Sequence, residues 1–173
     1  MKSSPIELRR EEMVLAMAGS LHTISRPVAF PSDVNPERLK DCQVVYVEGH
    51  EEWVLVSAEG QPIGVVDCPF GHEDAWLWVQ ESFIKAADCD RVIFKSDLPE
   101  KAWEGVSWID ARELSKNASR FSLRIHAIKV VWANDPVQGL VQCWSLGIHT
   151  YPCGIQELPV INEPAVNQMH FSA

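Results

Sequence analysis

The sequence has few basic residues for its length. Lys and Arg number 15 against 24 Asp and Glu, which gives a formal net charge of −9 at pH 7. A protein that follows a nucleic-acid backbone needs a basic surface to displace counterions. The densest basic cluster, Arg9 and Arg10, is followed at once by Glu11 and Glu12. The composition therefore argues against nucleic-acid binding, and it favours either plain solubility or a partner that is basic.

Long hydrophobic runs are also lacking. The first residues, MKSSPIELRREE, have no apolar stretch of the kind that a secretion signal needs. No apolar run approaches the roughly 18 residues that span a bilayer. The five cysteines are an odd number and include no C-x-x-C pair. We therefore expect a cytoplasmic protein that makes no membrane contact and keeps its cysteines reduced, with no disulfide.

Sequence motifs for phosphate and metal binding are missing too. Neither G-x-G-x-x-G nor G-x-x-x-x-G-K-[ST] occurs, so no glycine-rich loop is available to hold a phosphate. Two sets of side chains carry zinc-ligand chemistry but lack the paired short spacings of zinc modules. The sets are Cys143, His149 and Cys153, and Cys68, His72 and Glu73. We expect neither a metal nor a cofactor.

What is present is the composition of an ordinary globular protein. The chain has 173 residues, of which 46% are hydrophobic and 23% are charged. This length suits a single domain, 1–173, with one core. We find no internal repeat and no linker. Residues 158–173 contain two prolines and no clear period, so we expect a loosely ordered C-terminal tail.

Several segments predict helices. Ser4-Pro5-Ile6-Glu7 is typical of a helix start and predicts a helix over 5–18 that ends at Gly19; the alternative is a short helix followed by a strand at 13–17. A short helix is expected from Asn35, after a loop over 26–36, and another over 109–116. Four apolar residues recur at three- and four-residue spacing and predict a core-facing helix over 72–87. They are Trp76, Val79, Phe83 and Ala87.

Runs of β-branched and aromatic residues predict the strands. We expect strands over 43–48 and 91–95, and a β-hairpin over 53–67 that turns at Gly60. Residues 122–132 and 140–146 should pair antiparallel across a turn at 134–139. The predicted fold class is α+β, a single domain with a mixed or mostly antiparallel sheet and helices packed on one face.

A glycine-containing motif lies near the C-terminus. The stretch CWSLGIHTYPCGIQELPV, residues 143–160, places Ser145, Gly147, Ile148, Gly154 and Glu157 at the positions of a T-x-G-L-x-x-F/H-G-x-x-E-like signature. It resembles a bacterial family of uncharacterised proteins, a domain of unknown function with some members near toxin and immunity genes. The resemblance covers about residues 73–160 and implies a fold type and, through its context, an immunity or anti-defence role.

The residues of this motif also have a reading of their own. Gly147 and Gly154 are suited to a sharp return of the chain, because glycine reaches positive φ without a clash. Glu157 could then accept hydrogen bonds from a nearby turn. A ligand site formed by the three residues is the alternative.

Two Cys–His pairs are candidates for nucleophilic catalysis, which needs a thiol within reach of a base. They are Cys153 with His149, and Cys68 with His72, each four residues apart. A buried cysteine that merely fills core space is the competing interpretation. A small hydrolase or ligand-binding enzyme using Cys153 and His149 is therefore the alternative function.

The leading hypothesis rests on two of the seven tryptophans. Trp103 and Trp108 lie in the stretch LPEKAWEGVSWID together with Glu104 and Asp110. An aromatic residue among acids on a loop is typical of an interface anchor, although packing onto the core is the alternative. We therefore predict a non-enzymatic, immunity-like protein-binding module that presents this loop to a basic protein partner.

Overall fold

The computed structural model describes residues 3–35, 38–86 and 91–153. Its fold class is α+β, as the sequence predicts, and most of its regular structure is strand. The chain forms two compact units: the first contains Met1–His22, Trp76–Arg124 and His149–Ala173, and the second contains Thr23–Ala75 and Ile125–Ile148. One domain over residues 1–173 stays a prediction, and the predicted tail, 158–173, lies outside the described residues.

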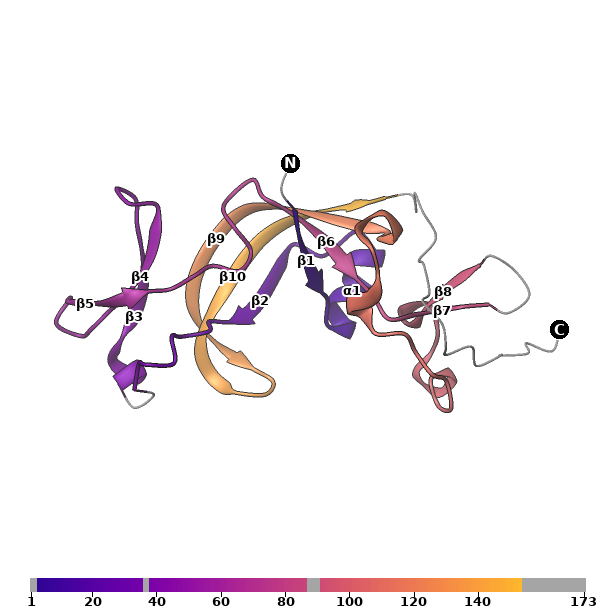
Figure 1. The fold of residues 1–173 in the computed structure, drawn as a ribbon, viewed down its shortest axis with the longest axis horizontal. Helices are drawn as coiled ribbons and strands as arrows, with labels where there is room; N and C mark the ends of the chain where they lie inside the picture. Colours follow the sequence, from indigo (N-terminus) through magenta and orange to yellow (C-terminus); the bar gives the residue numbers. More distant parts are fainter. Residues whose placement is uncertain (1–2, 36–37, 87–90, 154–173) are drawn as a thin grey trace. The chain divides into compact units, whose positions relative to one another are not determined.

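The first unit contains a mixed sheet. β1 (Ser3–Glu7) runs parallel to β6 (Trp76–Gln80), and β6 pairs antiparallel with the start of β9 (Phe121–Asp135). A second, two-stranded sheet pairs β7 (Phe83–Lys85) with β8 (Val92–Phe94), as Figure 1 shows. The predicted strand over 91–95 is confirmed by β8.

The helix predicted over 5–18 is wrong in its first half. Pro5 lies in β1, which is the edge strand of its sheet, and an edge position tolerates a residue that has no N–H to donate. α1 covers only Arg10–Met17, and at its start the backbone N–H of Arg9 donates to the Glu12 carboxylate at 2.8 Å, which is one half of a capping box. The predicted end is correct, since Gly19 follows the helix with φ +69°.

The helix predicted over 72–87 is also wrong. The segment forms β6 and β7, and Ala87 lies outside the described residues. Burial alternates along β6: Leu77 and Val79 are buried, and Trp76, Trp78 and Gln80 are only partly buried. Val79 and Phe83 do reach the core, but from two different strands, because aromatic and β-branched residues suit a pleated surface.

The other predicted helices are single 3-10 turns. The helix predicted from Asn35 is reduced to η1 (Arg38–Asp41), and the helix predicted over 109–116 is reduced to η4 (Ala111–Glu113). Further 3-10 turns, which were not predicted, are η2 (Lys95–Asp97), η3 (Glu100–Ala102) and η5 (Lys116–Ala118). Within the described ranges α1 is the one α-helix, so the predicted layer of helices on one sheet face is not shown. In this part of the chain, no helix has the length and apolar character needed to cross a membrane.

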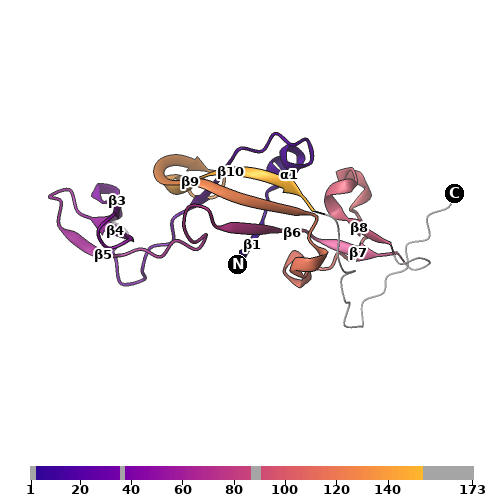
Figure 2. The same cartoon turned by 90° about the horizontal axis from the view of Figure 1, so that it is seen from above.

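The second unit is built from antiparallel strands. β3 (Gln43–Val47), β4 (Glu52–Val56) and β5 (Pro62–Val65) form a three-stranded meander, labelled in Figures 1 and 2. The predicted strand and hairpin are thus confirmed, and Gly60 turns with φ +76°. β2 (Thr23–Pro27) pairs antiparallel with β10 (Gly139–Pro152), so the predicted loop over 26–36 begins too early.

The predicted pairing of 122–132 with 140–146 is confirmed. β9 and β10 are neighbours in the sheet and lie side by side in both views (Figures 1 and 2). Only Pro136, Val137 and Gln138 connect them, a link far too short for parallel strands. Both strands extend further than predicted and contribute residues to each unit.

Gly147 has a different role from the predicted chain reversal. It lies inside β10 and is not among the glycines with positive φ. A Cβ at this position would come within 2.7 Å of Cε1 of His126, so the ring of His126 packs directly onto the Gly147 backbone. The close approach of a side chain, and not a turn, is what glycine permits here.

Buried side chains form the core of each unit. In the first unit Phe83, Phe94, Leu114 and Ala118 make one cluster. In the second, Ile24, Leu55, Trp144, Leu146 and Ile148 are fully buried. A buried side-chain amide also makes hydrogen bonds in the second unit. Gln142 on β10 donates to the Cys42 carbonyl and accepts from the Val44 N–H, each at 2.9 Å.

Replacing Gln142 with leucine should destabilise the protein by about 2 to 4 kcal/mol. The change leaves one backbone N–H and one C=O without partners in a buried site, and each costs about 1–3 kcal/mol. Urea unfolding followed by circular dichroism measures the loss. Gln138→Leu, at an exposed turn position, is the matched control. Equal stabilities of the two variants would contradict the role of Gln142.

Candidate functional site

A cleft of about 860 Å³ lies within the second unit. Its walls come from the β3–β4 hairpin, the end of β5, the loop that follows β5, and β9. Its lining includes two aromatic residues and five acids, which are Tyr46, Trp53, Glu48, Glu51, Glu52, Asp67 and Glu73. The volume falls within the range of roughly 300–1,000 Å³ that is typical of ligand-binding pockets.

Aromatic rings connect this cleft to the core. Tyr46 and Trp53 are directly opposite each other on β3 and β4, so both side chains lie on one sheet face. Their ring centroids are 5.0 Å apart, and Trp53 meets the fully buried Trp144 edge-on at 4.9 Å. Tyr46, at the outer end of this series, is 46% exposed. The series presents a rigid aromatic surface to the cleft.

The carboxylates of the cleft are not neutralised by the chain itself. Glu48, Glu51, Glu52, Asp67 and Glu73 are all exposed. Within the described ranges, none of these five side chains has a hydrogen-bond or ion-pair partner, and neither Lys nor Arg is among the lining residues. The cleft therefore has a strongly negative potential beside the exposed Tyr46 ring and the half-buried Trp53 ring.

Sequence reasoning missed this site, although part of its signal is local. The stretch EGHEEW brings three carboxylates and Trp53 together at one hairpin turn, where Glu51 adopts φ 54°. Asp67 and Glu73 join them only because β5 pairs with β4 and returns the following loop to the same place.

Cys68 and His72 also line the cleft, but they do not form a nucleophile–base pair. Burial raises the pKa of the Cys68 thiol, against the opposing effect of hydrogen bonds from the backbone N–H groups of Phe70 and Gly71. The thiol is therefore protonated at neutral pH. Nδ1 of His72 donates to the backbone carbonyl of Glu73, which leaves Nε2 as the acceptor of the ring. Among the described residues no hydrogen bond joins this ring to the Cys68 thiol.

The predicted partner-binding loop, residues 103–110, is largely occupied by its own unit. Trp103 and Trp108 are half-buried, and the indole N–H of Trp103 donates to the carbonyls of Lys95 and Leu98 at 3.0 and 3.2 Å. Asp110 caps η4 and forms an ion pair with Arg112 at 2.9 Å. Glu104 is exposed. The loop is thus less acidic, and its rings less available, than the sequence suggests.

The predicted Cys153–His149 pair is separated by the extended backbone. His149 lies within β10 and Cys153 directly follows it. A spacing of four residues along a strand corresponds to about 13 Å, which is beyond hydrogen-bond reach. The Cys153 thiol instead donates to the Ser122 hydroxyl at 3.1 Å. This geometry does not support the alternative hydrolase.

The structure also bears on the predicted free cysteines and on the two candidate zinc sets. Cys42, Cys68, Cys143 and Cys153 are free thiols, and Cys89 lies outside the described residues. Neither of the two candidate zinc sets is brought together, since the described ranges hold no group of three or more side chains placed to bind a metal ion.

No protein-family model, no curated protein and no solved structure matches this chain. The resemblance of residues 73–160 to a bacterial family therefore stays a prediction. Gly154 and Glu157 of the signature lie outside the described residues.

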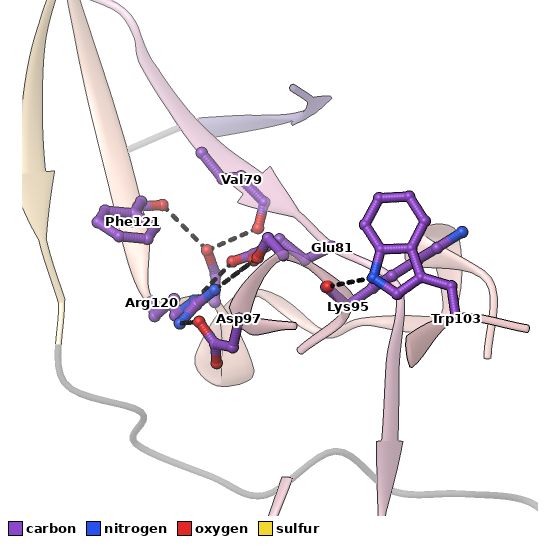
Figure 3. A network of polar contacts seen from close by, with 9 residues as sticks. Val79, Glu81, Lys95, Asp97, Trp103, Arg120 and Phe121 are labelled. Carbon is purple, nitrogen blue, oxygen red and sulfur yellow. Dashed lines mark hydrogen bonds and ion pairs between the residues drawn. The ribbon is translucent and has the colours of Figure 1, made fainter. Parts of the chain in front are cut away.

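The first unit contains a buried ionic network that sequence reasoning also missed. The Arg120 guanidinium donates to both oxygens of Glu81, at 2.9 and 2.7 Å, and to Asp97 at 2.8 Å (Figure 3). The Ser96 hydroxyl donates to Glu81 at 2.6 Å. Burial lowers the pKa of Arg120, but the hydrogen bonds and charges of Glu81 and Asp97 outweigh it and raise this pKa overall. Glu81 and Arg120 are 39 positions apart, so no local pattern signals their contact.

Removing the cation of this network should be costly. Arg120→Met leaves the Glu81 carboxylate, whose side chain is 5% exposed, without a counter-ion, and breaking such a pair costs about 3–5 kcal/mol. Adding Glu81→Gln to the variant should recover part of the loss, because no unpaired charge remains. Chemical unfolding measures both. Arg112→Met, which breaks an exposed pair, is the control, and an equal loss in that variant would contradict the network's role.

Asp110 should titrate well below an ordinary aspartate. The side-chain hydrogen bonds from Arg112, with a further bond from its backbone N–H, hold the pKa of Asp110 at about 2, compared with 3.8. Because the pKa is lowered on folding, the stabilisation is present above 3.8 and is lost as the pH falls through about 2. Carboxyl ¹³C NMR should show the midpoint moving back toward 3.8 in Arg112→Met. An unchanged midpoint would show that another group lowers it.

Proposed function

We propose that this chain is a non-enzymatic binding protein that holds a lysine- or arginine-bearing segment of a basic protein partner in the cleft of its second unit. The observation that carries the proposal is the combination of five unpaired carboxylates with the exposed Tyr46 ring and the half-buried Trp53 ring in one cleft. The net charge of −9 is in keeping with it.

Each part of the cleft has a clear task in such binding. An ammonium or guanidinium group is attracted to the face of an aromatic ring, by about 0.5–1 kcal/mol at exposed sites. The surrounding carboxylates accept its hydrogen bonds and raise the rate of association through long-range attraction. Because the rings of Tyr46 and Trp53 are tilted by 53° to each other, they offer faces of different direction to a partner side chain.

The loop over 103–110 is a less suitable surface for the same partner. The acids Glu100 and Asp110 already bind Arg10 and Arg112, and the Trp103 ring already has two cations over it. An immunity or anti-defence role, the expectation from the family resemblance, would be one case of binding a basic partner, and it belongs to this proposal.

A triple variant of the cleft tests the proposal. Glu48→Gln, Glu52→Gln and Asp67→Asn together remove three cleft carboxylates. The control triple, Asp33→Asn, Asp41→Asn and Glu59→Gln, removes three exposed carboxylates of the same unit that do not line the cleft. Both triples change the net charge equally, so general electrostatic attraction is matched.

Calorimetric titration with hexa-lysine and hexa-arginine peptides measures the difference. We expect the cleft triple to weaken binding roughly tenfold relative to the control triple, and Tyr46→Ala to weaken it about threefold through loss of a ring face. Glu104→Gln should leave affinity near that of the unaltered protein. Equal losses in the two triples would refute the cleft as the binding site, and a larger loss in Glu104→Gln would return the surface to the 103–110 loop.

A further inference from the structure

The first unit has a pocket of its own, of about 250 Å³. It is enclosed by Glu7 and Leu8, by α1, by the end of β6 with the two residues after it, and by residues of the segment from Lys95 to Trp103. Leu8, Met13, Val14 and Leu98 supply an apolar wall. The volume is below the usual range for drug-sized ligands, so the pocket suits a small molecule.

Two acids line this pocket: Glu7, which is exposed and takes part in an interaction of its own, and Glu81, whose charge is satisfied within the unit. Glu81 is buried, and its two oxygens accept hydrogen bonds from Arg120 and Ser96, as Figure 3 shows. Arg120 thus neutralises the Glu81 carboxylate. A ligand would meet little net negative charge from Glu81.

The basic side of the pocket is not satisfied. The Lys95 ammonium lies 4.6 Å from the ring centroid of Trp103 and 5.9 Å from that of Trp108. Among the described residues it has no carboxylate within ion-pair distance. Lys95 is half-buried, so this cation is partly removed from water and has only aromatic faces as partners.

The position of this cation is well defined. Trp103 donates its indole N–H to the Lys95 carbonyl at 3.0 Å, and Figure 3 shows the Lys95 side chain extending along the same indole. Arg10 places a guanidinium, the second cation over this ring, at 5.3 Å from the Trp103 centroid, with Glu100 as its ion-pair partner. A preorganised ammonium beside an apolar wall is what recognises an anion carrying an apolar body.

The geometry points to a second ligand site: the pocket binds a small organic anion, with its carboxylate or phosphate group on Lys95 and its apolar body against Leu8, Met13, Val14 and Leu98. Arg10 also lines the pocket, with its charge paired to Glu100. This site is independent of the proposed cleft in the second unit, since it uses other residues and the opposite charge.

NMR titration of the full chain tests the site with four probes: benzoate, phenyl phosphate, inorganic phosphate and benzyl alcohol. We expect saturable shifts of the Trp103 indole N–H with benzoate or phenyl phosphate. Inorganic phosphate lacks the apolar body and benzyl alcohol lacks the charge, so the affinity of each should be at least roughly tenfold lower. Failure of both aromatic anions to bind, or equal binding of inorganic phosphate and phenyl phosphate, would overturn the proposal.

Variants assign the binding to Lys95. Lys95→Met should weaken the aromatic anion at least about tenfold, the loss expected for a charge-assisted hydrogen bond. Lys101→Met, on the neighbouring exposed turn, removes the same charge outside the pocket and should leave affinity unchanged. Equal affinities of the two variants would overturn the assignment.

A second pair of variants avoids any effect of Lys95 on folding. Val14 lines the pocket and is 54% exposed, so polar replacements there are tolerated. Val14→Asp places a negative charge at the apolar wall and should bind the anion several-fold more weakly than Val14→Asn, which has the same shape. If the Asp and Asn variants bind equally, the anion does not occupy this pocket.

Discussion

The hydrogen-bonded pairing of β9 with β10 is the interaction on which the rest of the structure depends. The two strands are 15 and 14 residues long, and both units draw residues from them. Leu123 and Ile125 on β9, and Leu146 and Ile148 on β10, are fully buried. In the five-stranded sheet β6 attaches to β9, β1 attaches to β6, and β2 attaches to β10. Loss of this pairing would divide the five-stranded sheet between β9 and β10.

Charge is distributed very differently over the two units. In the first, Arg120 neutralises Glu81 and Asp97, and Asp110 is held by Arg112. In the second, the five carboxylates of the cleft have no such partners among the described residues. Like charges at this density repel one another, and an incoming cation relieves the repulsion. The cleft therefore holds a local excess of negative charge.

Aromatic rings follow the same division. Trp103 already has two cations of its own chain over its ring, Lys95 and Arg10. Tyr46 and Trp53 have only each other and the buried Trp144. The first arrangement leaves a cation without a counter-ion, and the second leaves ring faces without a cation. The two pockets consequently suit ligands of opposite charge.

Local sequence was sufficient to predict those features of the fold that depend on residues close together in the chain. Gly60 turns the predicted hairpin and Gly19 ends α1, because positive φ is a property of the single residue. The β-prone run before Trp132 and the run after Gly139 likewise became a strand pair. The spacing of Trp76, Val79 and Phe83 misled, because aromatic and β-branched residues at such intervals suit a helix face and a strand equally.

The sequence by itself determined the net charge, the turns and most of the antiparallel strands, since these follow from composition and from residues close together in the chain. Only the tertiary structure decided which acids keep their charge unpaired. Glu81 meets Arg120 across 39 positions, and Asp67 reaches Glu52 and Trp53 in the cleft through the pairing of β4 with β5. Pro5 lies in a strand for the same reason, because β6, far along the chain, offers it an edge position. Ion pairs and strand edges depend on distance in space, and sequence spacing does not encode that distance.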